Sequence, residues 1–560
     1  MLKLLLQSVF ELFQKLLGLF INRPAYNQLK KSRSFSLGIP CDAEFAKIAP
    51  GAPSSSADAR SETSSDCSPD CSSDCSSDCS SGLYSELYSG FYLLESNLDA
   101  FLARYELIEN AKQTLDLQYY YFHGDTSGKL IASALVKAAN REVRVRVLLD
   151  DIETLGADES VRILNEHPDI EIRLFNPFFF RGLLRYIEFI TDLSRVGRRM
   201  HNKAIIADNC QAIIGGRNIG DNYFSANPEF FFLDIDLLSA GVVVNEVSTG
   251  FDEYWNSRWA VPVENLYSRP DKKYASKKIK KYLQRYVQDV KKVDFEEALN
   301  RSDFKKNRSL AELPYIWAQA RLFYDAPSKI DKTHLSDNKQ LRIDFREILN
   351  SAEHSLTFIT PYFVPGTQGL NWFLELRSKG IEINVFTNSL AATDVVAVHA
   401  GYARYRKKLL AAGVNLYELK PSAYVRDRQK LKVLRPGSRT SLHAKTVIID
   451  SQKVFVGSPN FDPRSSNLNT EMGLLVNSKE LAMQVLDLFC GDIMKQNSYH
   501  LILEGSGYKN RNLNTAKRGK IVWHSEERAE DIQYFSDPRA GFWRKLSVLI
   551  YRLLPVEEFL

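Results

Sequence analysis

The chain has 560 residues, which is too long for one ordinary domain and fits two large units or roughly three to four smaller ones. With 44% hydrophobic and 25% charged residues, the composition is that of a globular protein and excludes a disordered or fibrous chain. The formal net charge of +5 is small for this length, so overall charge gives no indication of nucleic-acid binding.

Residues 1–22 predict an amphipathic helix. Apolar residues cover one wide face, and polar or small residues recur every three or four positions, at Lys3, Gln7, Glu11, Gln14 and Gly18. We expect this helix to lie in a membrane interface; a packed helix and an export or lipoprotein signal are the alternatives. The sequence has no run of about 18 uncharged apolar residues, so it predicts no transmembrane helix.

Residues 23–82 predict a flexible linker rich in serine. Four of the seven cysteines lie here in a Ser/Asp-rich tract, at Cys67, Cys71, Cys75 and Cys79. This pattern is no disulfide framework for a large fold, and C-x-x-x-C repeats without histidine match zinc spacing poorly. Metal binding and lipid attachment are therefore the less favoured alternatives to a plain linker.

The rest of the chain repeats itself. HNKAIIADNCQAIIGGRN begins at His201, HAKTVIIDSQKVFVGSPN begins at His443, and the two align without a gap over 18 residues. The matches extend upstream, where LDLQYYYF corresponds to LTFITPYF, and downstream, where FFLDIDLLSA corresponds to LNTEMGLLVN. Helices that alternate with nearly continuous apolar strands predict an α/β sandwich built twice, as a pseudo-twofold pair.

The repeat divides the chain. We place a first domain at 83–262, a basic helical connector at 263–304, a second domain at 305–503 and a C-terminal tail with an amphipathic segment at 504–560. The connector is expected to be a solvated helix.

Two further stretches suit a membrane interface. Residues 176–199, NPFFFRGLLRYIEFITDLSRVGRR, mix aromatic residues with arginines just before His201. Residues 541–554, GFWRKLSVLIYRLL, are basic and amphipathic. Ordinary helix packing is the alternative reading for both.

Each motif places a histidine, a lysine and an aspartate at fixed spacing. These six residues form the candidate catalytic set: His201, Lys203 and Asp208 in the first copy, and His443, Lys445 and Asp450 in the second. Side chains two apart in a strand point to the same face, so each histidine shares a surface with its lysine. We expect the two aspartates to anchor the strand ends and the lysines rather than to perform chemistry.

Downstream, the repeat pairs residues suited to hold phosphate and to orient the histidines. A glycine turn lets backbone N–H groups approach an anion, and amide side chains donate to it, so the candidate phosphate-binding residues are Gly216, Asn218, Ser458 and Asn460. A buried carboxylate should orient each imidazole and fix its tautomer. The candidates are Asp234 and Glu471, which the third segment of the repeat matches.

Two such halves placed face to face bring two imidazoles and two ammonium groups into one cleft, which suits a phosphodiester. Lysines and asparagines would hold the nonbridging oxygens and stabilise the charge of the transition state. One histidine would attack phosphorus, and the other would protonate the leaving oxygen and later deprotonate the acceptor. The lysines supply the positive charge, so this chemistry requires no metal and no other cofactor.

These motifs resemble those of the phospholipase D superfamily, which is defined by paired HxK(x)4D motifs. The resemblance covers roughly residue 83 to the C-terminus and is greatest to bacterial cardiolipin synthases of class C, in stretches such as LDLQYYYFHGDTSG, RMHNKAIIADN and SLHAKTVIIDSQKVFVGSPN. It implies two pseudo-twofold-related α/β/α sandwich domains with mixed sheets and an active site at their interface. It further implies that His201 is the nucleophile and His443 the general acid/base.

The activity that the resemblance implies is phosphatidyl transfer. A donor, phosphatidylethanolamine or phosphatidylglycerol, would leave its phosphatidyl group on histidine, and a hydroxyl of phosphatidylglycerol would then attack to form cardiolipin. The implied partners are phospholipid substrates and a membrane surface, with peripheral attachment at the bacterial inner membrane and no nucleic acid. Hydrolysis to phosphatidic acid, nucleic-acid phosphodiester cleavage and a non-catalytic membrane scaffold remain as alternatives. The small net charge weighs against nucleic acid, and the intact motifs weigh against a scaffold.

Overall fold

The computed structural model describes residues 88–152, 154, 158–182, 185–267, 310–331, 341–422, 438–491, 496–504, 519–527 and 530–553. The predicted helix at 1–22, the linker with its cysteine tract at 23–82 and most of the connector predicted at 263–304 lie outside these residues. Within the described ranges, no helix is long and apolar enough to cross a membrane.

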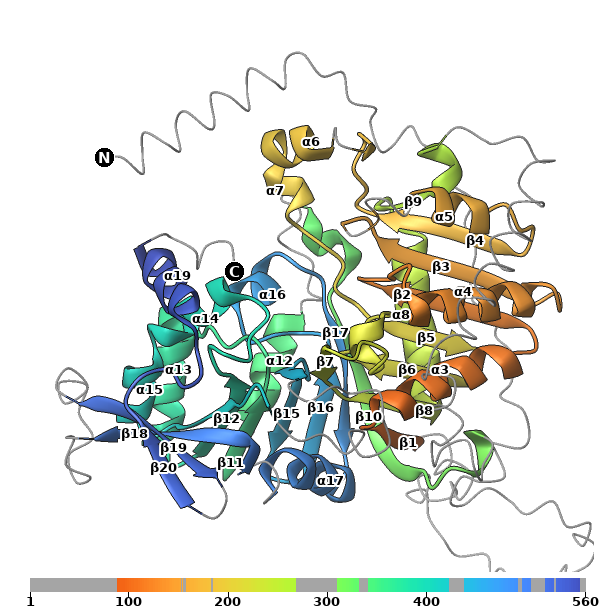
Figure 1. Cartoon of the computed structure of the whole chain (residues 1–560). Helices are drawn as coiled ribbons and strands as arrows, with labels where there is room; N and C mark the ends of the chain where they lie inside the picture. The colour runs from red at the N-terminus through yellow and green to blue at the C-terminus, as the bar shows by residue number, and fades with distance from the viewer. Residues whose placement is uncertain are drawn as a thin grey trace, which may run out of the picture.

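The first half forms a mixed sheet with helices on both faces (Figure 1). Its strands are β1 (Ser89–Leu94), β2 (Thr114–Tyr119), β3 (Arg144–Asp150), β4 (Ile170–Phe175), β5 (Ala204–Ala207), β6 (Gln211–Gly215), β7 (Phe230–Leu233), β8 (Asp236–Gly241) and β9 (Ala260–Pro262). Its helices are α3 (Asn97–Asn110), α4 (Thr126–Ala139), α5 (Asp158–Leu164), α6 (Arg185–Thr191), α7 (Leu193–Val196) and α8 (Val243–Trp255). The sheet order is β9-β4-β3-β2-β5-β6-β8-β1, parallel from β4 to β2 and antiparallel elsewhere.

The second half repeats this arrangement. Its strands are β10 (Ile316–Tyr324), β11 (Ser355–Ile359), β12 (Glu382–Asn388), β13 (Asn415–Leu419), β14 (Arg439–Leu442), β15 (Thr446–Ile449), β16 (Lys453–Gly457), β17 (Met472–Asn477) and β18 (Ser498–Glu504). Its helices are α12 (Leu341–Asn350), α13 (Gly366–Ser378), α14 (Val396–Ala403), α15 (Arg406–Ala411), α16 (Pro463–Asn467) and α17 (Lys479–Cys490). The order β18-β13-β12-β11-β15-β16-β17 has the same parallel and antiparallel pairs as its counterpart in the first half. The predicted pair of α/β/α sandwiches with mixed sheets is confirmed.

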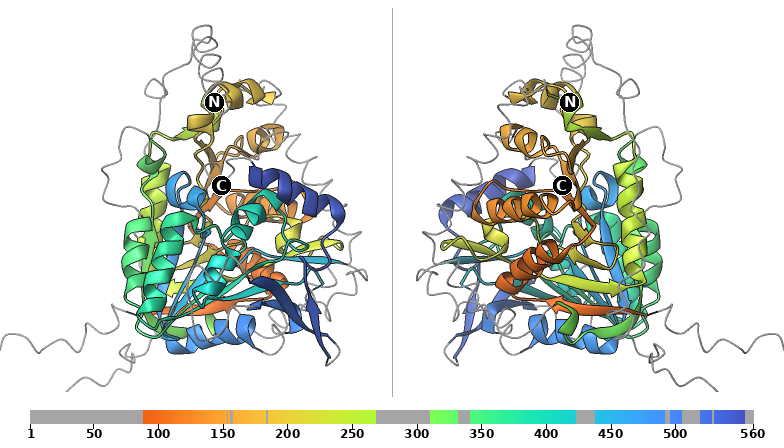
Figure 2. Two further views of the ribbon diagram at one scale, coloured as in Figure 1. Left: turned by 90° about the vertical axis from the view of Figure 1, so that its left-hand side faces the viewer. Right: turned by 90° about the vertical axis from the view of Figure 1, so that its right-hand side faces the viewer.

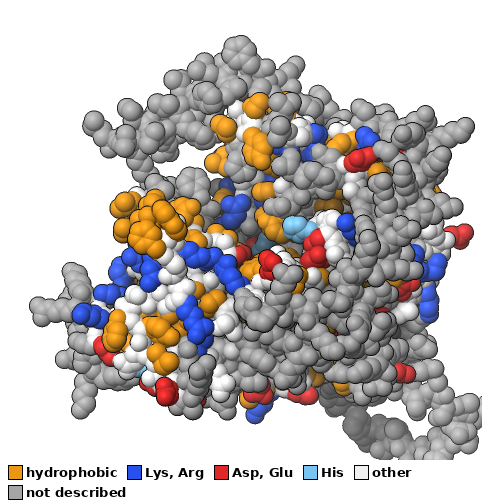
Figure 3. Space-filling model, viewed as in Figure 1, with side chains coloured by type: hydrophobic (Ala, Val, Ile, Leu, Met, Phe, Trp, Pro, Cys, Tyr) orange, Lys and Arg blue, Asp and Glu red, His pale blue; other side chains and the backbone are white. Residues whose placement is uncertain are grey.

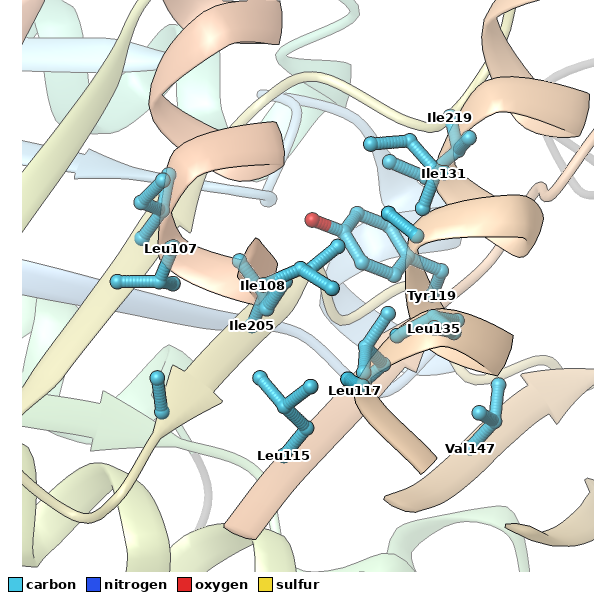
Figure 4. Packing of buried hydrophobic residues seen from close by; sticks show 14 of the residues in the cluster. Leu107, Ile108, Leu115, Leu117, Tyr119, Ile131, Leu135, Val147, Ile205 and Ile219 are labelled. Carbon is cyan, nitrogen blue, oxygen red and sulfur yellow. The ribbon is translucent and has the colours of Figure 1, made fainter. Parts of the chain in front are cut away.

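Alternation of side chains along the strands builds the layers. Ile205 packs into the cluster that contains Leu107 of α3 and Leu135 of α4, which Figure 4 shows from close by. Its neighbour Ile206 faces the opposite layer, with Val247 of α8. Figure 2 shows helices on either side of the strands in both views. Each aliphatic side chain buried in this way contributes about 1.5–3 kcal/mol relative to an exposed one.

A continuous sheet joins the two halves. β1 pairs with β8 along its length and with the start of β10, and β10 then pairs with β17 from Gln319 to Tyr324. One apolar cluster also includes residues from both sides of this boundary, among them Ile214, Leu237, Val456 and Leu474. The halves are therefore held in a fixed register, which brings the segments that carry the two motif histidines to the boundary between them.

The second half extends beyond the boundary predicted at residue 503. β19 (Lys520–Glu527) pairs with β18, and β20 (Glu530–Tyr534) pairs with β19. The buried indole of Trp523 donates to Glu418 at 3.0 Å. α19 (Phe542–Leu553) packs on α14, and Val548 is buried with Leu390 and Ala400. The described part of 504–560 is thus integral to the second sheet and its helices rather than a separate tail, because its apolar residues complete that core.

Candidate active site

The segments that carry the two motif histidines pair across the boundary between the halves. β14 pairs in parallel with β7, and the amides of His443 and Ala444 donate to Leu233 O at 2.7 and 3.1 Å. On the other side, His201 N donates to Thr470 O at 2.9 Å. Each histidine is therefore fixed against the segment of the opposite half that carries a candidate acidic residue.

The acidic residues are exchanged between the halves. His201 Nδ1 lies 2.8 Å from Glu471 Oε2, and His443 Nδ1 lies 2.6 Å from Asp234 Oδ2. Both carboxylates are fully buried. A carboxylate that accepts from Nδ1–H leaves Nε2 with its lone pair, which is the atom needed for attack or proton transfer. The sequence proposed these two acidic residues but did not assign either of them to a particular histidine.

Burial sets the protonation of the pairs. It lowers the pKa of His201 to about 4, although Glu471 acts in the opposite direction. Burial together with the charge of Lys445 lowers the pKa of His443 to about 3. Burial alone would raise the pKa of Asp234, but the adjacent His443 imidazole and the Lys445 ammonium group hold it at about 2. At neutral pH the free site therefore holds neutral imidazoles beside ionised carboxylates.

The two lysines are buried next to the histidines. Lys203 Nζ donates to His201 O at 2.6 Å, and Lys445 Nζ donates to His443 O and lies 2.9 Å from His443 Nδ1. Burial lowers the pKa of Lys203 to about 7 and that of Lys445 to about 8, against the pull of the nearby carboxylates. The expectation that the motif aspartates anchor these lysines is wrong, because each ammonium group donates to the carbonyl of its own histidine.

The motif aspartates lie away from the cleft. Asp208 accepts from the backbone amides of residues 112, 113 and 114 at 2.7–2.8 Å, and Asp450 accepts from those of residues 353, 354 and 355 at 2.7–2.9 Å. Seven residues of extended chain span roughly 23 Å, which separates each aspartate from its histidine. They fasten the loops that lead into β2 and β11, so their place in the candidate catalytic set is corrected to a structural one.

The glycine turns do not present free amides. Gly216 N donates to Ile235 O at 3.3 Å, and Ser458 N donates to Met472 O at 2.8 Å. The Ser458 hydroxyl donates to Glu471. A Cβ at Gly216 would lie 2.7 Å from Asp234 Cγ, so this glycine makes room for the carboxylate. The predicted phosphate-binding role of these backbone amides is therefore wrong, because strand pairing already uses them.

The two asparagines differ. Asn218 accepts from Tyr121 N at 3.2 Å and donates to the Tyr223 hydroxyl at 2.9 Å, so it braces the wall of the cleft. The side-chain oxygen of Asn460 is buried, and within the described residues it has no hydrogen-bond partner. That oxygen is an acceptor, so Asn460 would bind a phosphate oxygen only through its side-chain N–H group.

Aromatic residues that the sequence did not single out surround the imidazoles. The Tyr120 ring lies 4.9 Å from that of His201, and the rings of Tyr223 and Phe232 lie 5.1 and 4.7 Å from that of His443. The signal was present in the QYYYF run that follows the first matched strand. These rings leave the two histidines only 8% and 7% exposed, which limits the access of water.

Comparison with known proteins agrees with this architecture. The family model described as "Cardiolipin synthase, PLD-like domain" matches residues 105–255 and 345–493. Cardiolipin synthase C of Escherichia coli (strain K12) is 41% identical over 471 residues, which are 84% of this chain and 96% of that protein. Major cardiolipin synthase ClsA of Bacillus subtilis (strain 168) is 24% identical over 69% of this chain and 65% of its own. The crystal structure of phosphatidylserine synthase from Haemophilus influenzae Rd KW20 has the same fold, with a TM-score of 0.50 at 14% identity, over 73% of this chain and 87% of that one.

Proposed function

Because the chain belongs to the PLD-like cardiolipin synthase family, we propose that it is a phosphatidyltransferase that makes cardiolipin from a donor phospholipid and phosphatidylglycerol. The donor is phosphatidylethanolamine or phosphatidylglycerol. The observation that carries the proposal is the pair of buried histidines, each held by a carboxylate of the opposite half and each beside a buried lysine. This arrangement supplies a nucleophile, a proton donor and two cations to one phosphodiester.

In the first step, His201 Nε2 attacks phosphorus and the bond to the headgroup oxygen breaks. His443, protonated at Nε2, gives its proton to that oxygen, and the headgroup alcohol leaves. The negative charge of the bound phosphodiester favours the protonated form of His443, which burial disfavours in the free site. Lys203 and Lys445 stabilise the charge that develops on the nonbridging oxygens.

In the second step, a hydroxyl of phosphatidylglycerol attacks the phosphorus of the phosphohistidine and its proton passes to His443. The bond between phosphorus and His201 breaks, which restores the site and releases cardiolipin. Water in place of this hydroxyl would give phosphatidic acid. The aromatic cover and the low exposure of both imidazoles favour an acceptor that arrives with its own apolar chains.

We also propose that two helices hold the protein peripherally on the bacterial inner membrane. Tyr186 of α6 is 58% exposed, and Trp543 and Leu553 of α19 are 75% and 83% exposed. Figure 3 shows apolar side chains gathered over both helices. We expect Trp543→Ser with Leu553→Ser to weaken cosedimentation with vesicles. Met483→Ser on α17 is the matched control, because it also removes an exposed apolar side chain.

The decisive experiment incubates the purified chain in mixed vesicles with labelled phosphatidylglycerol, with and without phosphatidylethanolamine, and follows the lipids by chromatography and mass spectrometry. We expect the unsubstituted chain to make labelled cardiolipin and neither His201→Ala nor His443→Ala to make it. Dependence of this product on phosphatidylethanolamine would identify the donor. Phosphatidic acid alone would replace the proposal by a hydrolase. Full activity in either histidine variant would refute the shared site.

A further inference from the structure

A second candidate site lies at the start of α19, outside the two histidine–carboxylate pairs. A cavity of 470 Å³ opens there, and its lining includes Arg439, Arg539, Arg544, Phe542 and Trp543. The first residue belongs to β14, which ends next to His443, and the others belong to α19 and the turn before it. The mechanism above uses none of these residues.

The guanidinium groups of Arg439 and Arg544 in this cavity donate to backbone carbonyls. Arg439 donates to Ala391 O at 3.1 Å, and Arg544 donates to Leu390 O and Thr393 O at 2.8 and 2.9 Å. Arg539 donates to the Ser422 hydroxyl at 2.7 Å. Carbonyl partners orient a guanidinium without cancelling its charge, so Arg439 and Arg544 give the cavity a positive charge.

The pKa of Arg544 is consistent with positive charge gathered in this cavity. Burial and the charge of Arg439 lower the pKa of Arg544, and the acidic residue that opposes them is Asp394. Asp394 already accepts from the Tyr362 hydroxyl at 2.8 Å and lies within the influence of Lys445. Asp394 therefore acts on both Arg544 of the cavity and Lys445 of the active site.

The same contacts place the cavity next to the reaction. The carbonyls that accept from Arg544 belong to the loop that carries Asp394, and Lys445 acts on Asp394 from the catalytic side. On the other side, the exposed rings of Phe542 and Trp543 form part of the apolar surface over α19 (Figure 3). Basic side chains gather beside this surface in the same view. The cavity thus combines cations with an adjacent apolar face, which matches a phosphate carried on acyl chains.

We propose that the Arg439–Arg539–Arg544 cavity binds the phosphodiester group of the acidic acceptor lipid and holds its headgroup hydroxyl toward the catalytic histidines. This inference rests on the proposed function for the role of the lipid, but the binding itself does not. A zwitterionic lipid carries its own cation and would be bound more weakly, so the cavity separates the acidic acceptor from a zwitterionic donor.

The binding test uses Trp543, which lines the cavity, as a local reporter. The full chain with His201→Ala is labelled with 5-fluorotryptophan at its six tryptophans, and the Trp543 fluorine resonance is assigned with Trp543→Phe. Short-chain phosphatidylglycerol, short-chain phosphatidylcholine and inorganic phosphate are titrated separately, all as monomers in solution. We expect a saturable shift with phosphatidylglycerol alone. An equal shift with phosphatidylcholine or with phosphate would overturn the assignment to an acidic lipid, and no shift would overturn the site.

Variants then connect binding to turnover. Arg439→Gln and Arg539→Gln should each weaken the shift and raise the KM for phosphatidylglycerol roughly tenfold, the value of one charge-assisted hydrogen-bonded pair, with little change in kcat. Lys545→Gln is the matched control, since it removes the same charge from α19 outside the cavity and should change neither. Equal effects in the control would overturn the site, because they would show only a general attraction of the positive charges toward anionic surfaces. A preserved shift in a chain that makes no cardiolipin would leave this site standing and refute only the proposed function.

Discussion

Replacing Lys203 by methionine should stabilise the fold while it slows the chemistry. Lys203 is 1% exposed, and its pKa of about 7 compares with an ordinary value of 10.5. That difference, at about 1.4 kcal/mol per pH unit, corresponds to about 5 kcal/mol by which the folded state disfavours the charged lysine. Lys203 also helps to keep Glu471 ionised, which offsets part of the gain. We expect a net stabilisation of about 2–4 kcal/mol near neutral pH.

The pH dependence distinguishes this cause from a packing effect. The pKa of Lys203 is lower in the folded chain, so between about pH 7 and 10.5 the unfolded chain binds more protons. The stability of the unsubstituted protein therefore rises with pH across that window. The advantage of the Lys203→Met variant is fully present below about pH 7 and disappears as the pH approaches 10.5.

The assay is urea unfolding followed by tryptophan fluorescence, at about pH 6.5 and about pH 9, with differences taken at the transition midpoint. Lys408→Met serves as the control, because this lysine is exposed on α15 and its replacement should change stability by less than about 0.5 kcal/mol. Phosphatidyl transfer by Lys203→Met should fall by about 10²–10³-fold. A variant that is less stable than the unsubstituted protein, or whose advantage does not change with pH, would refute the argument.

Three further predictions concern other parts of the site. Glu471→Gln should impair formation of the phosphohistidine with any substrate. Asp234→Asn should recover activity on a nitrophenyl phosphodiester, because its leaving group needs no proton. Equal responses of both variants would contradict the assignment of the two histidines. Asp208→Asn should lower the free energy of unfolding by about 1–2 kcal/mol and leave the rate per folded molecule within a few-fold, as measured by calorimetry beside the transfer assay, and a large loss of rate would return this residue to the catalytic set. Gly216→Ala should displace Asp234 and reduce turnover more than stability, which is expected to fall by about 1–3 kcal/mol; unchanged kcat would show that the carboxylate can move aside.

The residues that recur in both halves could be identified from the sequence, whereas features that depend on strand pairing could not. The histidines and lysines stand in an ungapped match between the halves, so their common role could be inferred from spacing. The two acidic residues were found by the likeness of the third segment, because Asp234 lies 33 residues after His201 and Glu471 lies 28 residues after His443. Whether the amides of Gly216 and Ser458 are free depends on which strands pair with β6 and β16. The sequence repeat does not predict which strands pair. The strands β19 and β20 were not predicted, because they have no counterpart in the first half of the repeat.

The crossing of the acidic residues has a consequence for synthesis. His201 is made 270 residues before Glu471, the group that orients it. At about 5–20 residues per second, a ribosome takes roughly 15–50 s to cover that interval. During this time the imidazole of His201 has no acidic residue beside it, so we expect a chain truncated before Glu471 to be inactive.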